Sequence, residues 1–282
     1  SVSAFLLNRS SDLEIQTVSL PHTVKETPLS YFDESTYQMV SCYQKIIVAP
    51  PQWEKQVIKL TFEGVGHMAD VYINGQHVCH HECGYTAFSC DVSKVLKYGD
   101  ENLITVKVDS NETLDQPPFG YVIDYMTYGG IYRDVYFEVM EKVHFKDVFL
   151  QPALLERIST NKRSPKQIKM MKVQGILKSE CLLTKNIFKL SEKEQIFVRQ
   201  YLDDTLLLSQ PIGNIEEVEE GYLINITSAP TTVKLWDIES PHLYQVKTQI
   251  VYEDRVLDEH VGSIGFRNSE FKKTGYFLNG HL

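Results

Sequence analysis

The chain has 282 residues, 43% hydrophobic and 23% charged, with a formal net charge of −9. That length suggests two domains, each large enough to bury its own core. The acidic charge argues against nucleic-acid binding, because contacts to phosphates need a basic face. No apolar run approaches the roughly 20 residues of a membrane span. The first residues, SVSAFLLNRSSD, lack both the basic and the long apolar region of a signal peptide, and whether one was removed before residue 1 is left open.

The five cysteines, Cys42, Cys79, Cys83, Cys90 and Cys181, are odd in number and form no Cys-x-x-Cys pair. This pattern favours free thiols over a disulfide framework. It therefore predicts a reducing, cytoplasmic location.

A zinc site is an alternative use of His77, Cys79, His80, His81 and Cys83, which lie close together in sequence. Alternate residues of a strand point to opposite faces, so these side chains would be divided between two faces. Structural zinc sites usually take two ligands from each of two elements. We therefore expect neither a metal nor another cofactor.

The first half of the chain is predicted to form short strands separated by turns. Asn74-Gly75, between two apolar-alternating runs, predicts a type I′ hairpin over residues 70–78, with Val71 opposite Val78. The acceptor side chains of Asp91 and Ser93 are expected to cap a short turn over 94–96. Further strands are predicted at 18–22, 43–48, 58–62, 104–108 and 135–139.

The second half also predicts strands, at 172–177, 196–202, 222–226, 232–235, 243–252 and 256–261. Ser191 and Glu194 resemble a helix capping box, but the IFVRQYL that follows favours a strand. The basic stretch 158–169 is expected to be a loop or linker. Trp236 and Tyr244 are expected to be core or interface residues.

These patterns predict an all-β protein. Many short strands without βα alternation indicate a sandwich or jelly roll over residues 1–141. Seven or so short strands in the next 120 residues fit an immunoglobulin-like sandwich over residues 142–265. Residues 266–282 begin another strand and turn, which suggests a chain that continues into a further module.

The stretch PPFGYVIDYMTYGGIYRDVYFEV, residues 117–139, holds one carboxylate, Asp124, among tyrosines that include Tyr125 and Tyr128. The Gly129-Gly130 pair permits a turn or a close backbone approach. Aromatic faces and a carboxylate are the groups that would bind a polyol. The alternative is that these tyrosines lie in the sheet, with surface hydroxyls, and that Asp124 caps its own loop.

Six phrases in order carry a family resemblance: VSLPH (18–22), LTFEGVGHMADVYINGQHV (60–78), GYTAFSCDVS (84–93), GGIYRDV (129–135), LWDIESPHLY (235–244) and GFRNSEF with FLNG (265–280). With them the chain resembles the N-terminal part of glycoside hydrolase family 2, which includes β-galactosidases, β-glucuronidases and β-mannosidases. The chain departs from the family pattern at Cys83, where a glycine is common, and in its basic loop 156–170. The run DYMTYGGIYR is closer to the glucuronidase-like pattern.

The resemblance implies a jelly-roll sugar-binding domain, an immunoglobulin-like domain and then a (β/α)₈ barrel, with both catalytic glutamates beyond Leu282. It also implies that Asp124 contacts the bound sugar and that Tyr125 or Tyr128 packs nearby. Arg133 is expected to hold the loop through an internal salt bridge. His22 is expected to be a hydrogen-bonded structural residue.

Hydrolysis by a retaining glycosidase needs two carboxyl groups about 5–5.5 Å apart. The acidic pairs of this chain, Asp203-Asp204, Glu216-Glu217 and Glu219-Glu220, are expected in solvated loops, so no catalytic residue is predicted here. The expected partners are a carbohydrate substrate, the chain's own barrel domain and, as an option, a second copy. The rival functions are a carbohydrate-binding module without a barrel and an adhesion or scaffolding protein.

Overall fold

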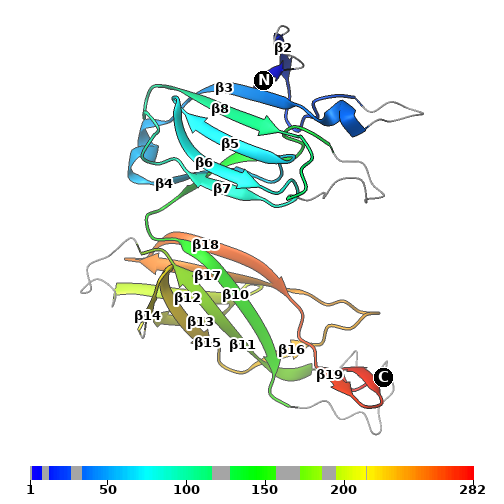
Figure 1. Ribbon diagram of the computed structural model, residues 1–282. Coiled ribbons are helices and arrows are strands. Elements are labelled where there is room, and N and C mark those ends of the chain that lie inside the picture. The colour runs from blue at the N-terminus through cyan, green and yellow to red at the C-terminus, as the bar shows by residue number, and fades with distance from the viewer. Residues whose placement is uncertain are drawn as a thin grey trace. The chain divides into compact units, whose positions relative to one another are not determined.

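The computed structural model describes residues 2–7, 13–26, 34–115, 128–156, 172–185, 195–213 and 215–282. The chain divides into two compact units, Ser1–Met140 and Glu141–Leu282. Strands build both units (Figure 1), and the helical elements of the described residues are two 3₁₀ segments, η1 (Glu34–Tyr37) and η2 (Pro51–Lys55). In these parts of the chain no helix has the length and apolar character needed to cross a membrane.

The first unit is a sandwich of two sheets with a shared core. The larger sheet has the order β2-β1-β3-β8-β5-β6. Its strands are β1 (Val2–Leu7), β2 (Leu13–Val18), β3 (Val40–Val48), β5 (Met68–Ile73), β6 (Gln76–Glu82) and β8 (Glu101–Asp109). The smaller sheet has the order β7-β4-β9, with β7 (Phe88–Asp91), β4 (Val57–Phe62) and β9 (Val135–Met140). Alternate residues of β4, β5 and β8 face inward and are buried, as strands with one face on a core require.

The hairpin between β5 and β6 confirms the predicted turn and corrects its register. Asn74 and Gly75 have φ values of 53° and 82°, and positive φ at both central residues is what a type I′ turn requires. Val71, however, pairs with Cys79 and not with Val78, because the register shifts between Val71 and Tyr72. A β-bulge adds one residue to the second strand, which alternation in the sequence did not indicate.

The predicted strand at 18–22 is also wrong. The strand β2 ends at Val18, and residues 19–22 form bends. The chain then runs beside the segment that precedes β9, where His22 N donates to Ile131 O (2.7 Å) and Val24 N donates to Gly129 O (3.1 Å). These residues are therefore paired with a loop and not with a strand. The predicted turn after β7 is present, with Ser93 N donating to Asp91 Oδ1 at 3.0 Å.

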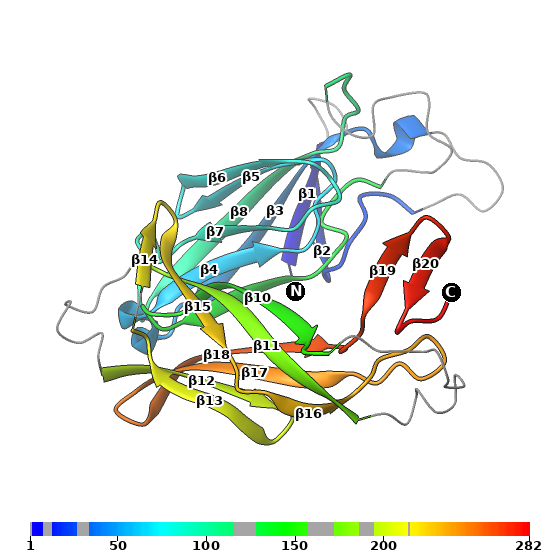
Figure 2. The same cartoon turned by 90° about the horizontal axis from the view of Figure 1, so that it is seen from below.

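The second unit is also a two-sheet sandwich (Figure 2). One sheet has the order β10-β11-β15-β14, with β16 also paired to β11, and the other has the order β13-β12-β17-β18. Their bounds are β10 (Phe145–Leu154), β11 (Lys172–Leu183), β12 (Ile196–Leu202), β13 (Thr205–Pro211), β14 (Ile215–Val218), β15 (Gly221–Thr227), β16 (Thr231–Lys234), β17 (Tyr244–Tyr252) and β18 (Arg255–Ile264). Together with the first unit, this confirms the predicted all-β fold class of two sandwiches.

Within the second unit, β12 shows why IFVRQYL forms a strand. Ile196, Val198, Gln200 and Leu202 are buried and alternate with partly exposed residues, which is the period of a strand and not of a helix. The preceding Ser191 and Glu194, and the basic stretch 158–169, lie outside the described residues.

Trp236 and Tyr244 both pack in the second unit. Tyr244 stacks edge-on against the fully buried Phe266, with ring centroids 5.8 Å apart. The Arg267 guanidinium lies 5.1 Å from the centroid of the Trp236 ring. The chain ends in a hairpin of β19 (Ser269–Lys272) and β20 (Gly275–Leu278).

Candidate functional site

One end of the first unit joins backbone segments that are far apart in the sequence. Gly66 and Gly130 form an antiparallel bridge, with N–O distances of 3.0 and 3.3 Å. Ser110 Oγ donates to the Gly66 carbonyl at 2.7 Å, and His67 N donates to Asp109 O at 3.0 Å. We call these residues and the loops that hold them the loop end. Ser110 and Gly130, which flank the segment that contains Asp124 in the sequence, both belong to this loop end.

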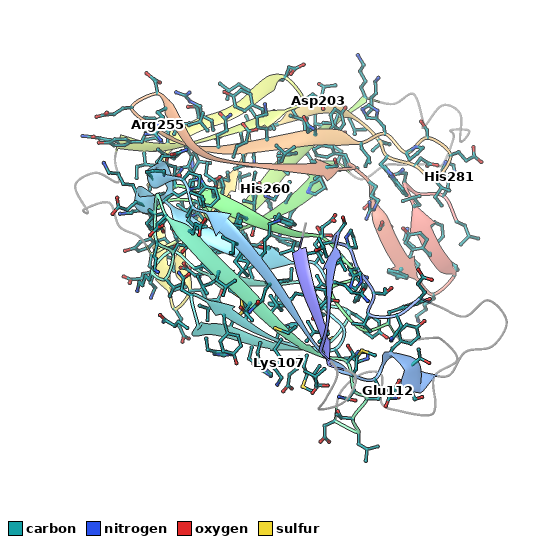
Figure 3. All side chains as sticks on the ribbon, turned by 90° about the horizontal axis from the view of Figure 1, so that it is seen from above. Lys107, Glu112, Asp203, Arg255, His260 and His281 are labelled. Atoms are coloured by element: carbon teal, nitrogen blue, oxygen red, sulfur yellow. A yellow bond between two sulfur atoms is a disulfide. The ribbon has the colours of Figure 1, made fainter. Side chains whose placement is uncertain are left out.

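Two of the predicted sugar-binding residues, Asp124 and Tyr125, lie outside the described residues. The third, Tyr128, is 43% exposed and packs edge-on against the buried Tyr37, with ring centroids 5.7 Å apart. Figure 3 shows Glu112 in the loop after β8, at the end of the unit where η1 lies. Tyr128 is therefore supported by a ring contact and is partly exposed to solvent at the loop end.

The Gly129-Gly130 pair permits the close approach that the sequence predicted. A Cβ on Gly129 would lie 2.5 Å from Ser110 Oγ, and one on Gly130 would lie 2.6 Å from Tyr43 Oη. Gly130 also has a φ of 105°, a conformation that side chains with a Cβ rarely adopt. Both positions therefore require glycine for steric reasons.

His22 is hydrogen-bonded at the base of this segment. Its Nδ1 lies 3.0 Å from Tyr43 Oη, and its backbone N–H donates to Ile131. Burial lowers the pKa of His22, so its ring stays neutral over a wider pH range. Burial also raises the pKa of Tyr43 to about 12, with hydrogen bonds to the Ile131 backbone and the Ser41 side chain acting in the opposite direction. These contacts fit a structural role for His22.

His67 belongs to the loop end and was missed in the sequence. It is only 4% exposed, and its Nδ1 has no hydrogen-bond partner among the described residues. Burial lowers the pKa of His67, while the charges of Glu112 and Asp109 act in the opposite direction. Its ring is therefore a neutral group packed against Gly84, where an added Cβ would lie 2.9 Å from Nδ1.

Arg133 bridges loops through backbone carbonyls. Its Nη1 lies 3.4 Å from both Glu63 O and Tyr85 O, and its guanidinium lies 5.3 Å from the Tyr132 ring centroid. The Tyr132 hydroxyl in turn donates to the Gly84 carbonyl. The predicted partner of Arg133 was a carboxylate, whereas the contacts within the described part of the chain are to carbonyls and a ring.

The cysteine prediction is wrong for one pair. Cys79 on β6 and Cys90 on β7 form a disulfide, whereas Cys42, Cys83 and Cys181 are free. The bond joins the edge strands of the two sheets, a relationship that spacing in the sequence does not reveal. Because a structural disulfide favours an oxidising compartment, cysteine usage no longer argues for a cytoplasmic location.

Cys83 occupies a position that suits glycine. Its φ is 122°, in the region where side chains are disfavoured, which gives a physical reason for the glycine common there in the family pattern. Hydrogen bonds from the Tyr85 backbone, and from Thr86, lower the pKa of the Cys83 thiol.

The histidines of the alternative zinc set are spread over two faces. His77 Nε2 and His80 Nδ1 lie 3.3 and 2.8 Å from Asp70 Oδ1 on the exposed face of the sheet. His81 instead stacks on Phe88 with a centroid distance of 4.3 Å. Among the described residues, no group of three or more His, Cys, Asp or Glu side chains could hold a metal ion.

The acidic pairs of the second unit lie at its surface. Asp203, which is labelled in Figure 3, and Asp204 occupy a turn after β12. Asp203 Oδ1 accepts a 2.9 Å hydrogen bond from Gln245 N. The pairs 216–217 and 219–220 are exposed, the first on β14 and the second in the turn that follows it. None of these six carboxyl groups therefore lies in an enclosed site.

Two β-sandwiches in this order match two models of one protein family. The family model for the glycosyl hydrolases family 2 sugar binding domain matches residues 12–140. A second glycosyl hydrolases family 2 model matches residues 143–267. The chain therefore belongs to glycosyl hydrolase family 2.

Known relatives extend well beyond the length of this chain. It is 34% identical over 273 residues to a β-galactosidase of Thermoanaerobacter pseudethanolicus, covering 94% of this chain and 33% of that protein. It is 27% identical over 279 residues to a β-glucuronidase of Bacteroides fragilis, covering 95% of this chain and 37% of that protein. The chain thus spans about a third of the length of the curated relatives it matches.

Solved structures show the same fold. A mutant of Bacteroides uniformis β-glucuronidase 2 aligns with a TM-score of 0.73 at 25% identity, covering 94% of this chain and 31% of that one. A β-D-glucuronidase from Dictyoglomus thermophilum aligns with a TM-score of 0.70 at 20% identity, covering 99% of this chain and 45% of that one.

Proposed function

We propose that this chain is the non-catalytic N-terminal part of a retaining hydrolase of family 2 that cleaves terminal O-glycosidic bonds, of the β-galactosidase or β-glucuronidase type. The observation that carries the proposal is the match of both units, in order, to family 2. The names of the relatives support the two substrate types. The catalytic acid and nucleophile would lie on a barrel domain that follows in the longer polypeptide and contacts this part.

The first unit would then form a wall of the active-site mouth. Asp124 would act there as an acceptor for sugar hydroxyls, with Tyr125 or Tyr128 packing against the ring. The support is the construction of the loop end. The segment that contains Asp124 is preceded by Ser110, bonded to Gly66, and followed by Gly130, bridged to the same residue. A segment held at both boundaries can present a carboxylate reproducibly.

We propose that this chain alone does not hydrolyse glycosides. Retaining hydrolysis needs a protonated and an ionised carboxyl group about 5–5.5 Å apart. The paired acids at 203–204, 216–217 and 219–220 are exposed. Incubation of the isolated chain with chromogenic β-galactosides and β-glucuronides should give no turnover above buffer, and turnover would contradict the proposal.

The role of Asp124 is tested in the longer polypeptide that carries the barrel. Asp124→Ala should lower kcat/KM by ~2–3 kcal/mol, the cost of a lost charge-assisted hydrogen bond. Asp115→Ala is the matched control, because Asp115 is an exposed acid in the same connection and should leave kcat/KM unchanged. Equal rates for Asp124→Ala and the parent enzyme would reassign Asp124 to a role within its own loop.

The same experiments separate the proposal from a carbohydrate-binding or adhesion module. A site with a single wall leaves most of a ligand in water, so titration of the isolated chain with monosaccharides should show weak or no binding. Sub-millimolar affinity for an oligosaccharide would favour the binding module. Reading the coding sequence past residue 282 gives a second check, because the hydrolase needs two glutamates at the ends of barrel strands.

A further inference from the structure

His67 lies where several segments of the first unit meet. It directly precedes β5, its N–H donates to Asp109 O at the end of β8 (3.0 Å), and its carbonyl accepts from Cys83 N after β6 (3.2 Å). The residue before it, Gly66, forms the bridge to Gly130. A movement that displaces the backbone of His67 therefore acts on the whole loop end.

The His67 ring is enclosed, and one of its nitrogen atoms is left without a hydrogen bond. The residue is 4% exposed, and the described residues offer Nδ1 no partner. Backbone fills the space beside this atom, because a Cβ on Gly84 would lie 2.9 Å from Nδ1 and 3.4 Å from Gly66 Cα. A buried polar atom without a partner lowers stability, so packing alone does not account for a histidine here.

The neutral and the protonated forms of this ring differ in what they require. A neutral imidazole carries a proton on one nitrogen only, so Nδ1 can be the nitrogen that carries none. A protonated ring carries a proton on both nitrogens, which would bury a charged N–H donor at Nδ1 without an acceptor. The enclosed site therefore accepts the neutral ring and disfavours the charged one.

Two carboxylates lie near the ring on the β8 side. The charges of Glu112 and Asp109 raise the pKa of His67, but the lowering by burial is the larger effect. Neither carboxylate bonds to Nδ1. Asp109 Oδ1 instead accepts from the backbone N and the side-chain Nδ2 of Asn111, at 3.0 and 2.6 Å. The carboxylates thus reduce the penalty of a charged ring without removing it.

The other elements packed around His67 also carry titratable groups. On the β6 side, the Cys83 thiol is hydrogen-bonded to Tyr85 and Thr86. In the segment before β9, the Tyr132 hydroxyl donates to the Gly84 carbonyl. A second histidine of the loop end, His22, is half-buried and titrates in the same pH range, so its contribution has to be separated from that of His67.

We propose that protonation of His67 opens the loop end while the two sheets of the first unit stay folded. The charged ring gains an acceptor, from water or from a carboxylate, only if the backbone beside it moves away. That movement breaks the Gly66–Gly130 bridge and the hydrogen bond between Cys83 N and His67 O. The loop end is closed above pH 6.5, the ordinary pKa of an imidazole, and opens as the pH falls below it.

This opening would set an acid limit to kcat/KM in the hydrolase proposed above, a consequence that rests on the proposed function. The tests that follow use this chain alone and need neither a barrel nor a substrate. They can therefore fail while the proposed function holds, and an inactive longer polypeptide would not change their outcome.

Hydrogen exchange at pH 7.5 and pH 5.5, measured at increasing urea concentrations, tests the inference. Protection factors are compared, because they remove the intrinsic pH dependence of exchange. The amides of Gly66, His67, Cys83 and Gly130 should lose about tenfold in protection at pH 5.5, where a free imidazole with a pKa of 6.5 is mostly protonated. Their exchange should depend only weakly on urea, since a local opening exposes little surface. A urea dependence as steep as that of amides in β3 and β8 would mean that the whole unit unfolds, and would overturn the inference.

A matched set of variants assigns the effect to one histidine. His67→Phe replaces the ring with one that cannot be protonated, so the loop-end amides should be equally protected at both pH values. His67→Gln makes the same test if the phenylalanine variant does not fold. His22→Gln is the control, and should retain the tenfold loss. A pH effect that disappears in His22→Gln, or that persists in a folded His67 variant, would overturn the inference.

Discussion

The hydroxyl of Tyr43 lies 3.0 Å from Nδ1 of His22. The backbone of Gly130 approaches the same hydroxyl so closely that a Cβ on this glycine would lie 2.6 Å from it. The side-chain pair and the glycine therefore depend on each other. Tyr43 belongs to strand β3, so β3 limits how closely the segment before β9 can approach the core. In this way the core of the sandwich sets the position of the segment that follows Asp124.

Substitution of this glycine should be costly. Gly130→Ala combines a clash with Tyr43 and the His22 carbonyl with an unfavourable φ of 105°, and we expect it to lower the free energy of unfolding by ~2–4 kcal/mol. Gly75→Ala is the control, because Gly75 also has positive φ, 82°, but nothing lies within 4 Å of its Cβ position. Urea unfolding measures both. Equal losses would show that conformation alone, and not the close approach, requires glycine at 130.

Stability should fall as the pH drops below about 6.5. Burial lowers the pKa of both His22 and His67 from the ordinary value of 6.5, so the unfolded chain binds protons at a pH where the folded chain does not. The two neutral rings contribute their full stability above pH 6.5. This contribution is lost as the pH falls through the lowered pKa values that the two histidines have in the folded protein. His80 acts in the opposite sense, because hydrogen bonds to Glu82 and Asp70 raise its pKa, but it is largely exposed and its effect is screened.

Urea midpoints at pH 7.5 and pH 5.5 test this expectation. His67→Gln should reduce the difference between the two midpoints, since glutamine cannot be protonated in this range. His80→Gln is the control and should leave the difference unchanged or slightly larger. A difference unaffected by His67→Gln would mean that acid destabilisation arises elsewhere in the chain.

The disulfide predicts how many free thiols the chain has before and after reduction. Under denaturing, non-reducing conditions, thiol titration should find three thiols from Cys42, Cys83 and Cys181, and reduction should raise the number to the chain's total of five. Cys79 and Cys90 are separated by 11 positions, and a loop of that length should contribute about 3 kcal/mol. The Cys79→Ser, Cys90→Ser double variant should lose that amount, whereas Cys42→Ser should lose much less. Five thiols before reduction would contradict the disulfide.

A buried asparagine network offers a fourth stability test. Asn102 is fully buried, and its side chain bonds to Lys97 N and O at 2.8 Å, to Asp100 O at 3.0 Å and to Asn74 at 2.9 Å. Asn102→Ala leaves several of these groups without partners and should cost ~2–4 kcal/mol. Asn111→Ala, at a half-buried position whose side chain bonds to the neighbouring Asp109 among the described residues, should cost less than about 1 kcal/mol. Comparable losses in the two variants would show that the Asn102 network contributes little to the free energy of unfolding.

Local features were predictable from the sequence, and contacts between distant segments were not. Asn74-Gly75 determines its own turn, because positive φ at two successive positions selects those residues. The Val71–Cys79 register depends on a bulge that alternation does not reveal. The Cys79–Cys90 bond depends on which edges of two sheets meet, and no spacing rule gives that. The contact of Tyr37 with Tyr128 was not predictable for the same reason, because it joins residues that are far apart in the sequence.

The strongest functional expectation beyond Asp124 concerns Tyr128. Its ring packs against Tyr37, and the residue as a whole is 43% exposed at the loop end, so we expect it to contact a sugar without losing its support. In the longer enzyme, Tyr128→Ala should lower kcat/KM by ~0.5–1.5 kcal/mol, the value of one aromatic contact, mainly through a higher KM. Tyr128→Phe keeps the ring and should retain most of the activity. Tyr136→Ala, at a tyrosine of similar exposure on β9, should change neither parameter, and an equal loss there would assign the effect of Tyr128 to folding and not to substrate contact.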